Sequence, residues 1–140
     1  MLTRDQILQA DDLSREKVDV PEWGGCVCVR ELTASEKDAF DAETYVLKGR
    51  ETVINRRDFK ARLLVRSICD EAGKPIFTLK DIQALGAKSL KASERVAAVA
   101  MRLSAMTAEA QEELSGNSKG GQPEDLPSDS PPISELQTSG

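Results

Sequence analysis

Two cysteines separated by one residue, Cys26 and Cys28, are the side chains of this sequence most suited to chemistry. Residues i and i+2 of a strand point to the same side, so these two thiols could hold one soft metal ion together. A zinc site needs four ligands, and the chain adds only Cys69 and no histidine. We therefore expect no metal and no cofactor, and three free thiols that act as small apolar side chains.

The lack of histidine also bears on catalysis, because Ser–His and Cys–His dyads are then impossible. Acidic residues such as Asp11, Asp12 and Glu43 fall in polar helix faces or loops, without an apolar pocket that would make acid–base catalysts of them. The glycine pair after Trp23 lacks the lysine and the following helix of a phosphate-binding loop. These observations predict that the chain is not an enzyme.

Positive charge is concentrated between residues 48 and 66, although the whole chain has a formal net charge of −5. Three interpretations of this basic segment remain open: a solvated surface, a contact with an acidic face of another protein copy, or a nucleic-acid site. Nucleic acid is the least favoured partner, because proteins that bind duplexes usually carry an excess of Lys and Arg. For a protein contact, the candidates in this segment are Arg50, Arg56, Arg57 and Lys60.

A β-hairpin is expected at about residues 17–31. Lys17 to Val20 alternates polar and apolar residues, Pro21 to Gly25 supplies turn residues, and Cys26 to Arg30 is apolar with alternate valines. This second strand is covered either by helices of its own subunit or by another subunit. Trp23 either anchors an interface or folds back over its own helices. Trp23, Val27 and Val29 are therefore further candidates for protein contact.

The rest of the chain is mostly helical in pattern. Capping boxes at Thr3 and Thr33 predict helices over residues 4–10 and 35–47. Residues 50–54 indicate a loop, with a brief extended piece at Thr52-Val53-Ile54 as the alternative. An apolar stripe from Ala61 to Ala72 predicts a helix that Gly73 ends. Further helices are predicted over residues 79–85, 90–106 and 108–114.

The expected fold class is mainly α (α+β), a helical bundle preceded by the N-terminal β-hairpin, within a domain of residues 1–114. Residues 115–140 form an acidic tail rich in Pro, Gly and Ser, a composition typical of disordered tails or linkers. No apolar run approaches the roughly 20 residues that cross a bilayer, so we expect no contact with membranes.

Two segments carry a resemblance to a known family. The first is Val29-Arg30-Glu31-Leu32-Thr33-Ala34-Ser35-Glu36, which follows the hairpin. The second is Arg102-Leu103-Ser104-Ala105-Met106, with Gly116-Asn117-Ser118 further on. Over about residues 1–118 the chain resembles the tail assembly chaperones of bacteriophages with long non-contractile tails. These motifs are helix caps and turns, and the resemblance brings no catalytic residues with it.

The resemblance implies a late phage protein that binds the tape measure protein and keeps it soluble during tail assembly. It implies self-association, and a frameshifted longer form that recruits the tail tube protein. Such a chaperone works in the host cytoplasm and is absent from the mature virion. The alternative is a small nucleic-acid-associated or regulatory adaptor that uses the basic segment 48–66.

Overall fold

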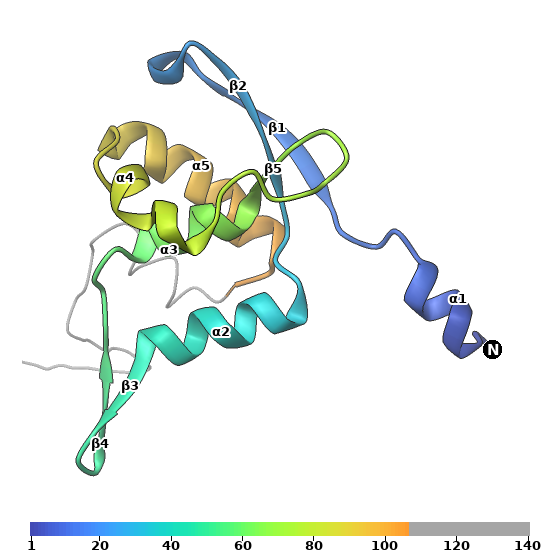
Figure 1. The fold of residues 1–140 in the computed structure, drawn as a ribbon, viewed down its shortest axis with the longest axis horizontal. Helices are drawn as coiled ribbons and strands as arrows, with labels where there is room; N and C mark the ends of the chain where they lie inside the picture. The colour runs from blue at the N-terminus through green and yellow to red at the C-terminus, as the bar shows by residue number, and fades with distance from the viewer. Residues whose placement is uncertain (107–140) are drawn as a thin grey trace, which may run out of the picture.

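The structure is a computed structural model that describes residues 1–106. The predicted helix over residues 108–114 and the tail of residues 115–140 lie outside the described residues. Figure 1 shows the arrangement of the elements. In chain order they are α1 (Arg4–Gln9), β1 (Arg15–Val20), η1 (Pro21–Trp23), β2 (Gly25–Arg30), α2 (Ala34–Thr44), β3 (Tyr45–Lys48), β4 (Glu51–Ile54), α3 (Phe59–Ser67), β5 (Ile68–Cys69), η2 (Leu79–Asp81), α4 (Ile82–Gly86) and α5 (Leu90–Leu103).

The predicted N-terminal hairpin is confirmed as the antiparallel pair β1 and β2. Its turn is the short 3-10 helix η1, capped at its C-terminal end by Gly24, whose φ of +80° is a left-handed conformation that suits glycine. Val18 pairs with Val27 in the register, and their side chains share the inner face of the sheet with Val20 and Val29. The apolar alternation of the sequence therefore builds one buried face.

A third strand, β5, was not predicted, because the apolar stripe favoured a helix as far as Ala72. The structure ends α3 at Ser67, and the next two residues pair with β2 in the register Val29↔Ile68 and Cys28↔Cys69. Ile68 is β-branched and is buried on the inner face of the sheet. This burial favours the strand conformation, although the apolar spacing of the sequence is that of a helix. The helix prediction was therefore wrong beyond Ser67. The sheet has the strand order β1-β2-β5.

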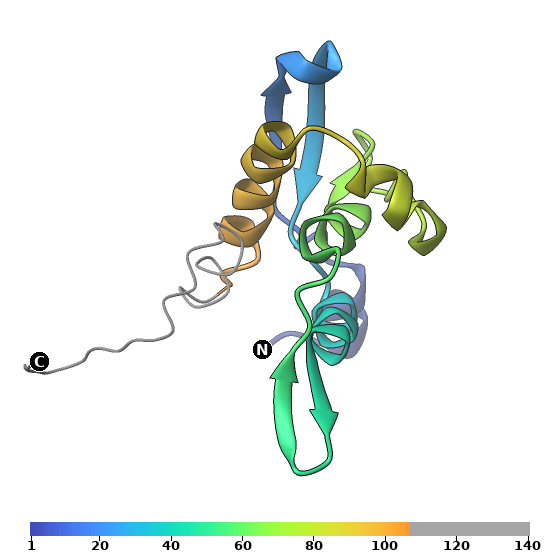
Figure 2. The same cartoon turned by 90° about the vertical axis from the view of Figure 1, so that its left-hand side faces the viewer.

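The core lies between this sheet and the helices α3 and α5. Helix α5 contacts both β1 and β2, and it also packs against α3. Figure 2 shows α5 beside the first hairpin. The side chains fully buried there include Val20, Val29, Leu63, Leu64, Ile68, Val96 and Met101. The described residues therefore form a mixed α/β structure in which helices pack on a sheet, and this differs from the plain helical bundle expected behind the hairpin.

The segment that leads from β2 into α2 is held by a capping box joined to a buried ion pair. Thr33 Oγ1 accepts a hydrogen bond from the Glu36 amide, and the Glu36 carboxylate accepts one from the Thr33 amide, as predicted. The same carboxylate accepts hydrogen bonds from both Nη atoms of Arg30, at 2.9 and 2.8 Å. These bonds fix the direction of the chain where the sheet gives way to helix.

A second hairpin replaces the predicted end of one helix and the loop after it. Helix α2 stops at Thr44, and residues 45–48 pair with residues 51–54 as β3 and β4. Tyr45 and Val46 favour strands, and Gly49 opens a two-residue turn with a φ of +65°, which suits the first turn position of a type II′ hairpin. The apolar residues near position 46 had been assigned to the helix.

Helix α1 has the predicted Thr3 capping box, but it buries none of its residues. In Figure 1 it stands apart from the rest of the molecule at the end of a short linker. A helix of this length is marginal in water by itself. Its exposed apolar side chains therefore remain available to a partner.

The turn of the first hairpin is tied to α5 by an ion pair. The guanidinium of Arg95 donates hydrogen bonds of 2.7 and 3.0 Å to the two carboxylate oxygens of Glu22. These hydrogen bonds lower the pKa of Glu22 from its ordinary value of 4.5 to about 2. The ionised form of Glu22 is therefore favoured in the folded state.

We expect Glu22→Gln to lower the stability at neutral pH, and the loss to disappear in acid. A carboxyl whose folded-state pKa is lowered contributes stability above its unfolded value of 4.5, and this contribution is lost as pH falls toward about 2. Urea unfolding followed by circular dichroism from neutral pH to about pH 2 measures this. The control is Glu71→Gln, at an exposed glutamate for which no ion pair is seen within residues 1–106. A constant difference between Glu22→Gln and wild type across this range would contradict the assignment.

Candidate functional site

The hairpin β3–β4 exposes several large apolar side chains. It projects from the body in both ribbon views, at the end opposite the turn of the first hairpin (Figures 1 and 2). Tyr45, Leu47 and Ile54 share one of its faces by register, while Val53 lies on the other. All four are exposed, Leu47 to 71%. Apolar side chains on both faces and two open strand edges are features of a surface that binds other chains.

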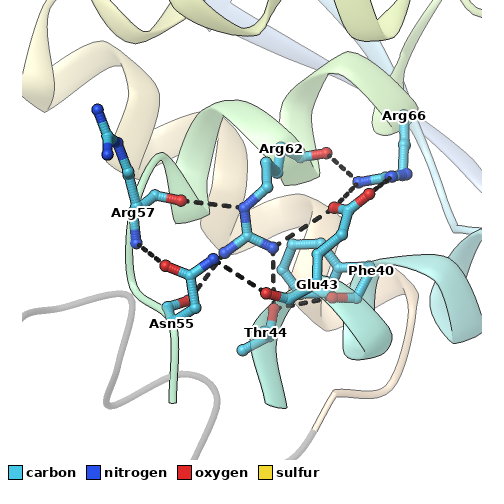
Figure 3. Close-up of polar contacts among 7 residues, drawn as sticks. All are labelled: Phe40, Glu43, Thr44, Asn55, Arg57, Arg62 and Arg66. Atoms are coloured by element: carbon cyan, nitrogen blue, oxygen red, sulfur yellow. Dashed lines mark hydrogen bonds and ion pairs between the residues drawn. The ribbon is translucent and has the colours of Figure 1, made fainter. Parts of the chain in front are cut away.

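The base of this hairpin is held by one buried arginine, Arg62 of α3. Its Nη2 donates to the Asn55 carbonyl at 2.9 Å, its Nε to the Arg57 carbonyl at 3.0 Å, and its Nη1 to Thr44 Oγ1 at 3.0 Å. Figure 3 shows the guanidinium between the end of α2 and the segment that leaves β4. Arg62 therefore joins the two chain segments that enter and leave the hairpin.

A second buried arginine completes this cluster. Arg66 donates hydrogen bonds of 3.1 and 2.7 Å to the Glu43 carboxylate, and another of 3.0 Å to the Arg62 carbonyl (Figure 3). The Arg62 guanidinium also lies 5.2 Å from the ring centroid of Phe40, within the range of cation–π attraction. Arg62 and Arg66 are thus structural, so two cations of the basic segment 48–66 are not available at the surface.

The remaining candidates from the basic segment are spread over separate positions. Arg50 is exposed in the turn of β3–β4. The Arg57 side chain is also exposed, and its backbone carbonyl accepts a hydrogen bond from Arg62. Arg56 and the half-buried Lys60 line a cavity of about 310 Å³ beside α3 together with Phe59. The structure therefore brings Arg56 and Lys60 together but leaves Arg50 and Arg57 outside this cavity.

The three candidates of the first hairpin have different surroundings. Trp23 and Val27 are half-buried and line a second cavity of about 300 Å³. Val29 has no exposed surface and lies in the core under α5, so a partner cannot reach it while this fold is intact. The apolar strand β2 is therefore covered, over Val29, by the protein's own helices. Sequence reasoning did not find the other walls of the Trp23 cavity, because Ile76, Phe77 and Leu85 come from distant parts of the chain.

The three cysteines all lie on the outer face of the first sheet. Cys28 pairs with Cys69 in the register, and Cys26 is two residues before Cys28 on the same strand. Cys26 is exposed, whereas Cys69 is buried and its Sγ donates a weak hydrogen bond to the Cys28 carbonyl at 3.6 Å. Burial, followed by the neighbouring Cys28 thiol, raises the pKa of the Cys69 thiol to about 11. Residues 1–106 contain no group of three or more Cys, Asp, Glu or His side chains placed to hold a metal ion.

We expect iodoacetamide to modify Cys26 well before Cys69 in the folded protein. Only the thiolate reacts, and a thiol with a pKa of about 11 is ionised to roughly one part in a thousand at about pH 8. Mass spectrometry of peptides taken over time measures both sites, and the urea-unfolded chain is the control in which the difference should vanish. Equal rates at Cys26 and Cys69 in the folded protein would contradict the burial described here.

No helix among residues 1–106 is long and apolar enough to cross a membrane. Within the same residues, the groups that could contact a partner include the exposed hairpin β3–β4, the exposed helix α1 and the cavities beside Trp23 and Lys60. These are apolar or mixed surfaces without an arrangement of nucleophile and base. Exposed apolar surface of this kind is typical of sites that bind other proteins.

Comparison with known proteins gives two findings. A sequence model of the family described as phage tail assembly chaperone matches residues 3–113. Among solved structures, the fold is similar to the tail assembly chaperone of bacteriophage HK97, with a TM-score of 0.51 and 20% sequence identity, covering 71% of this chain and 90% of that one. At this identity the likeness concerns the fold. A search of curated protein sequences finds no match.

Proposed function

Because this chain belongs to the phage tail assembly chaperone family, we propose that it binds the tape measure protein and keeps it soluble while the phage tail is assembled. In this role it makes and breaks no covalent bonds. It acts in the host cytoplasm and does not enter the mature virion. The client in this proposal is the tape measure protein, a long chain that must stay unaggregated until the tail tube forms around it.

The observation that carries this proposal is the projecting hairpin β3–β4. Its exposed apolar side chains offer contact to apolar segments of a client, and its two strand edges offer hydrogen bonds to an extended client chain. Arg62 fixes the base of the hairpin, so the binding surface keeps its position when no client is bound. This limits the entropy that is lost on binding.

Self-association and a second partner belong to the same proposal. Copies of the chain bound along one client would cover more of it if they also contacted each other, since linked binding events raise the overall affinity. A frameshifted longer form of this protein would carry an added domain that recruits the tail tube protein. The charged surface cations Arg50, Arg56 and Arg57 are candidates for contacts between copies.

The test is co-expression with the tape measure protein of the same phage. We expect this protein to bring the client into the soluble fraction and to co-purify with it. An insoluble client beside a well-folded, soluble copy of this chain would overturn the proposal. A gel shift with duplex DNA separates the alternative adaptor role, because real nucleic-acid binding weakens steeply with added salt.

A further inference from the structure

The cavity beside Lys60 combines positive charge with an apolar lining. Three cations and one acid line it together with apolar side chains: Arg56, Lys60, Lys88 and Asp58, with Phe59, Ala61, Leu85 and Leu90. Lys60 and Lys88 form no ion pair within residues 1–106. Leu90 is 62% exposed, so part of the apolar lining faces solvent. This site, the Lys60 cavity, therefore suits a segment that carries both carboxylates and an apolar side chain.

The negative charge of this chain is concentrated after the described residues. Residues 1–106 contain 18 Lys and Arg against 17 Asp and Glu, whereas residues 107–140 contain one lysine against seven acids. In the acidic tail of residues 115–140, an acid directly precedes a leucine twice, as Asp125-Leu126 and Glu135-Leu136. The tail thus provides the side chains that complement the charge and the apolar lining of the Lys60 cavity.

The tail is long enough to reach the cavity of its own subunit. Leu90 of the cavity is the first residue of α5, and the described chain ends at Met106, just past the other end of this helix. A helix of 14 residues is about 21 Å long. Residues 115–124 alone span up to about 33 Å when extended, so Asp125 reaches the cavity whether or not the predicted helix over residues 108–114 forms.

Tethering favours this tail over the same segment from another copy. A segment joined to its site by a short linker has an effective concentration of roughly millimolar. In dilute solution the tails of other copies are present at far lower concentration. The occupant that the sequence places closest to the cavity is therefore the chain's own tail.

We propose that the acidic tail folds back and docks in the Lys60 cavity of its own subunit. In this contact the Asp125 carboxylate lies beside Lys60 and Lys88, and Leu126 packs against Leu90. The contact leaves the hairpin β3–β4 uncovered, so it does not depend on the proposed function. It gives the basic segment an internal partner, because the tail competes with any external polyanion for the same lysines.

Leu90→Glu tests this contact in the full-length protein. The change removes an exposed apolar side chain from the cavity and adds negative charge there, at a first-turn position where a helix tolerates an acid well. Leu79→Glu is the matched control. Leu79 is the first residue of η2 behind the Thr78 cap, is 57% exposed and lines neither the Lys60 cavity nor the Trp23 cavity. Circular dichroism should report native folds for both variants.

Zero-length cross-linking with a carbodiimide measures the contact, since this reagent joins an amine and a carboxyl only where they touch. In dilute wild-type protein without client, we expect peptides that join Lys60 or Lys88 to a carboxylate of the tail within a monomer. Leu90→Glu should lower their yield about tenfold or more, because an aliphatic contact is lost and a like charge is added. Leu79→Glu should match wild type. Salt at about 1 M should also lower the wild-type yield, because it screens exposed ion pairs.

Three results would overturn the docking of the tail. In the first, Lys60 and Lys88 join the tail no more often than Lys48 and Lys74, which are exposed and lie outside the cavity. In the second, Leu90→Glu gives the wild-type yield. In the third, the joined tail belongs to another copy and appears as a covalent dimer, which assigns the cavity to contacts between copies. Co-expression with the tape measure protein measures the chaperone role separately, so either proposal can fail without the other.

Discussion

Arg62→Met is expected to lower the free energy of unfolding by about 1–3 kcal/mol, the usual cost of leaving a buried polar group without its hydrogen-bond partner. The Asn55 and Arg57 carbonyls and the Thr44 hydroxyl would lose their donor inside the protein. Methionine keeps much of the volume beside Phe40, so the loss reports the hydrogen bonds more than the packing. Urea unfolding monitored by circular dichroism gives the value.

Arg57→Met is the matched control for this experiment. The Arg57 side chain is exposed, and only its backbone N–H and carbonyl take part in the cluster, so its replacement should change stability by less than about 0.5 kcal/mol. Similar losses for Arg57→Met and Arg62→Met would mean that the cluster at the base of the hairpin contributes no special stability.

Leu47→Asp is expected to abolish client solubilisation while leaving the fold intact. Leu47 is the most exposed apolar residue of β3–β4 and buries little in its own subunit, so the free protein loses nothing that holds it together. A central apolar contact typically contributes about 2 kcal/mol or more, so client binding should weaken by roughly 30-fold or more. The fraction of tape measure protein that stays soluble on co-expression measures this.

Thr52→Asp is the paired control, because Thr52 lies directly opposite Leu47 in the register. It adds the same charge at the same place and on the same face, but it removes no large apolar side chain. If Thr52→Asp and Leu47→Asp lowered client solubility equally, charge rather than lost apolar contact would be the cause. If neither lowered it, the client would bind elsewhere.

Local signals predicted much of the fold. The capping boxes at Thr3 and Thr33 and the first hairpin are present, because each depends on neighbours within a few residues. The predicted apolar stripe of α5 is also confirmed, because Ala92, Val96 and Ala100 are buried. Such features are set by sequence spacing and need no knowledge of distant partners.

The predictions were wrong where contacts between residues far apart in the sequence determine the structure. No residue near Ile68 in the sequence indicates that Ile68 pairs with Val29 of β2, so the predicted helix was extended too far. Likewise, Arg62 and Arg66 look like surface charge until Glu43 of α2 is placed beside them. The hairpin β3–β4 was the one avoidable miss, since Lys48-Gly49-Arg50-Glu51 is a turn between two runs of strand-forming residues.

Strand β1 forms one edge of the three-stranded sheet, and in the described structure no strand pairs with its outer side. The outward side chains along it are Arg15, Lys17 and Asp19, so a strand that tried to add there would have to strip water from a row of charges. The hairpin β3–β4 has no such protection along its apolar residues. Among the described strands, the exposed large apolar residues thus lie only on the projecting hairpin, whereas the charged side chains of β1 make fibril-like growth from that edge unfavourable.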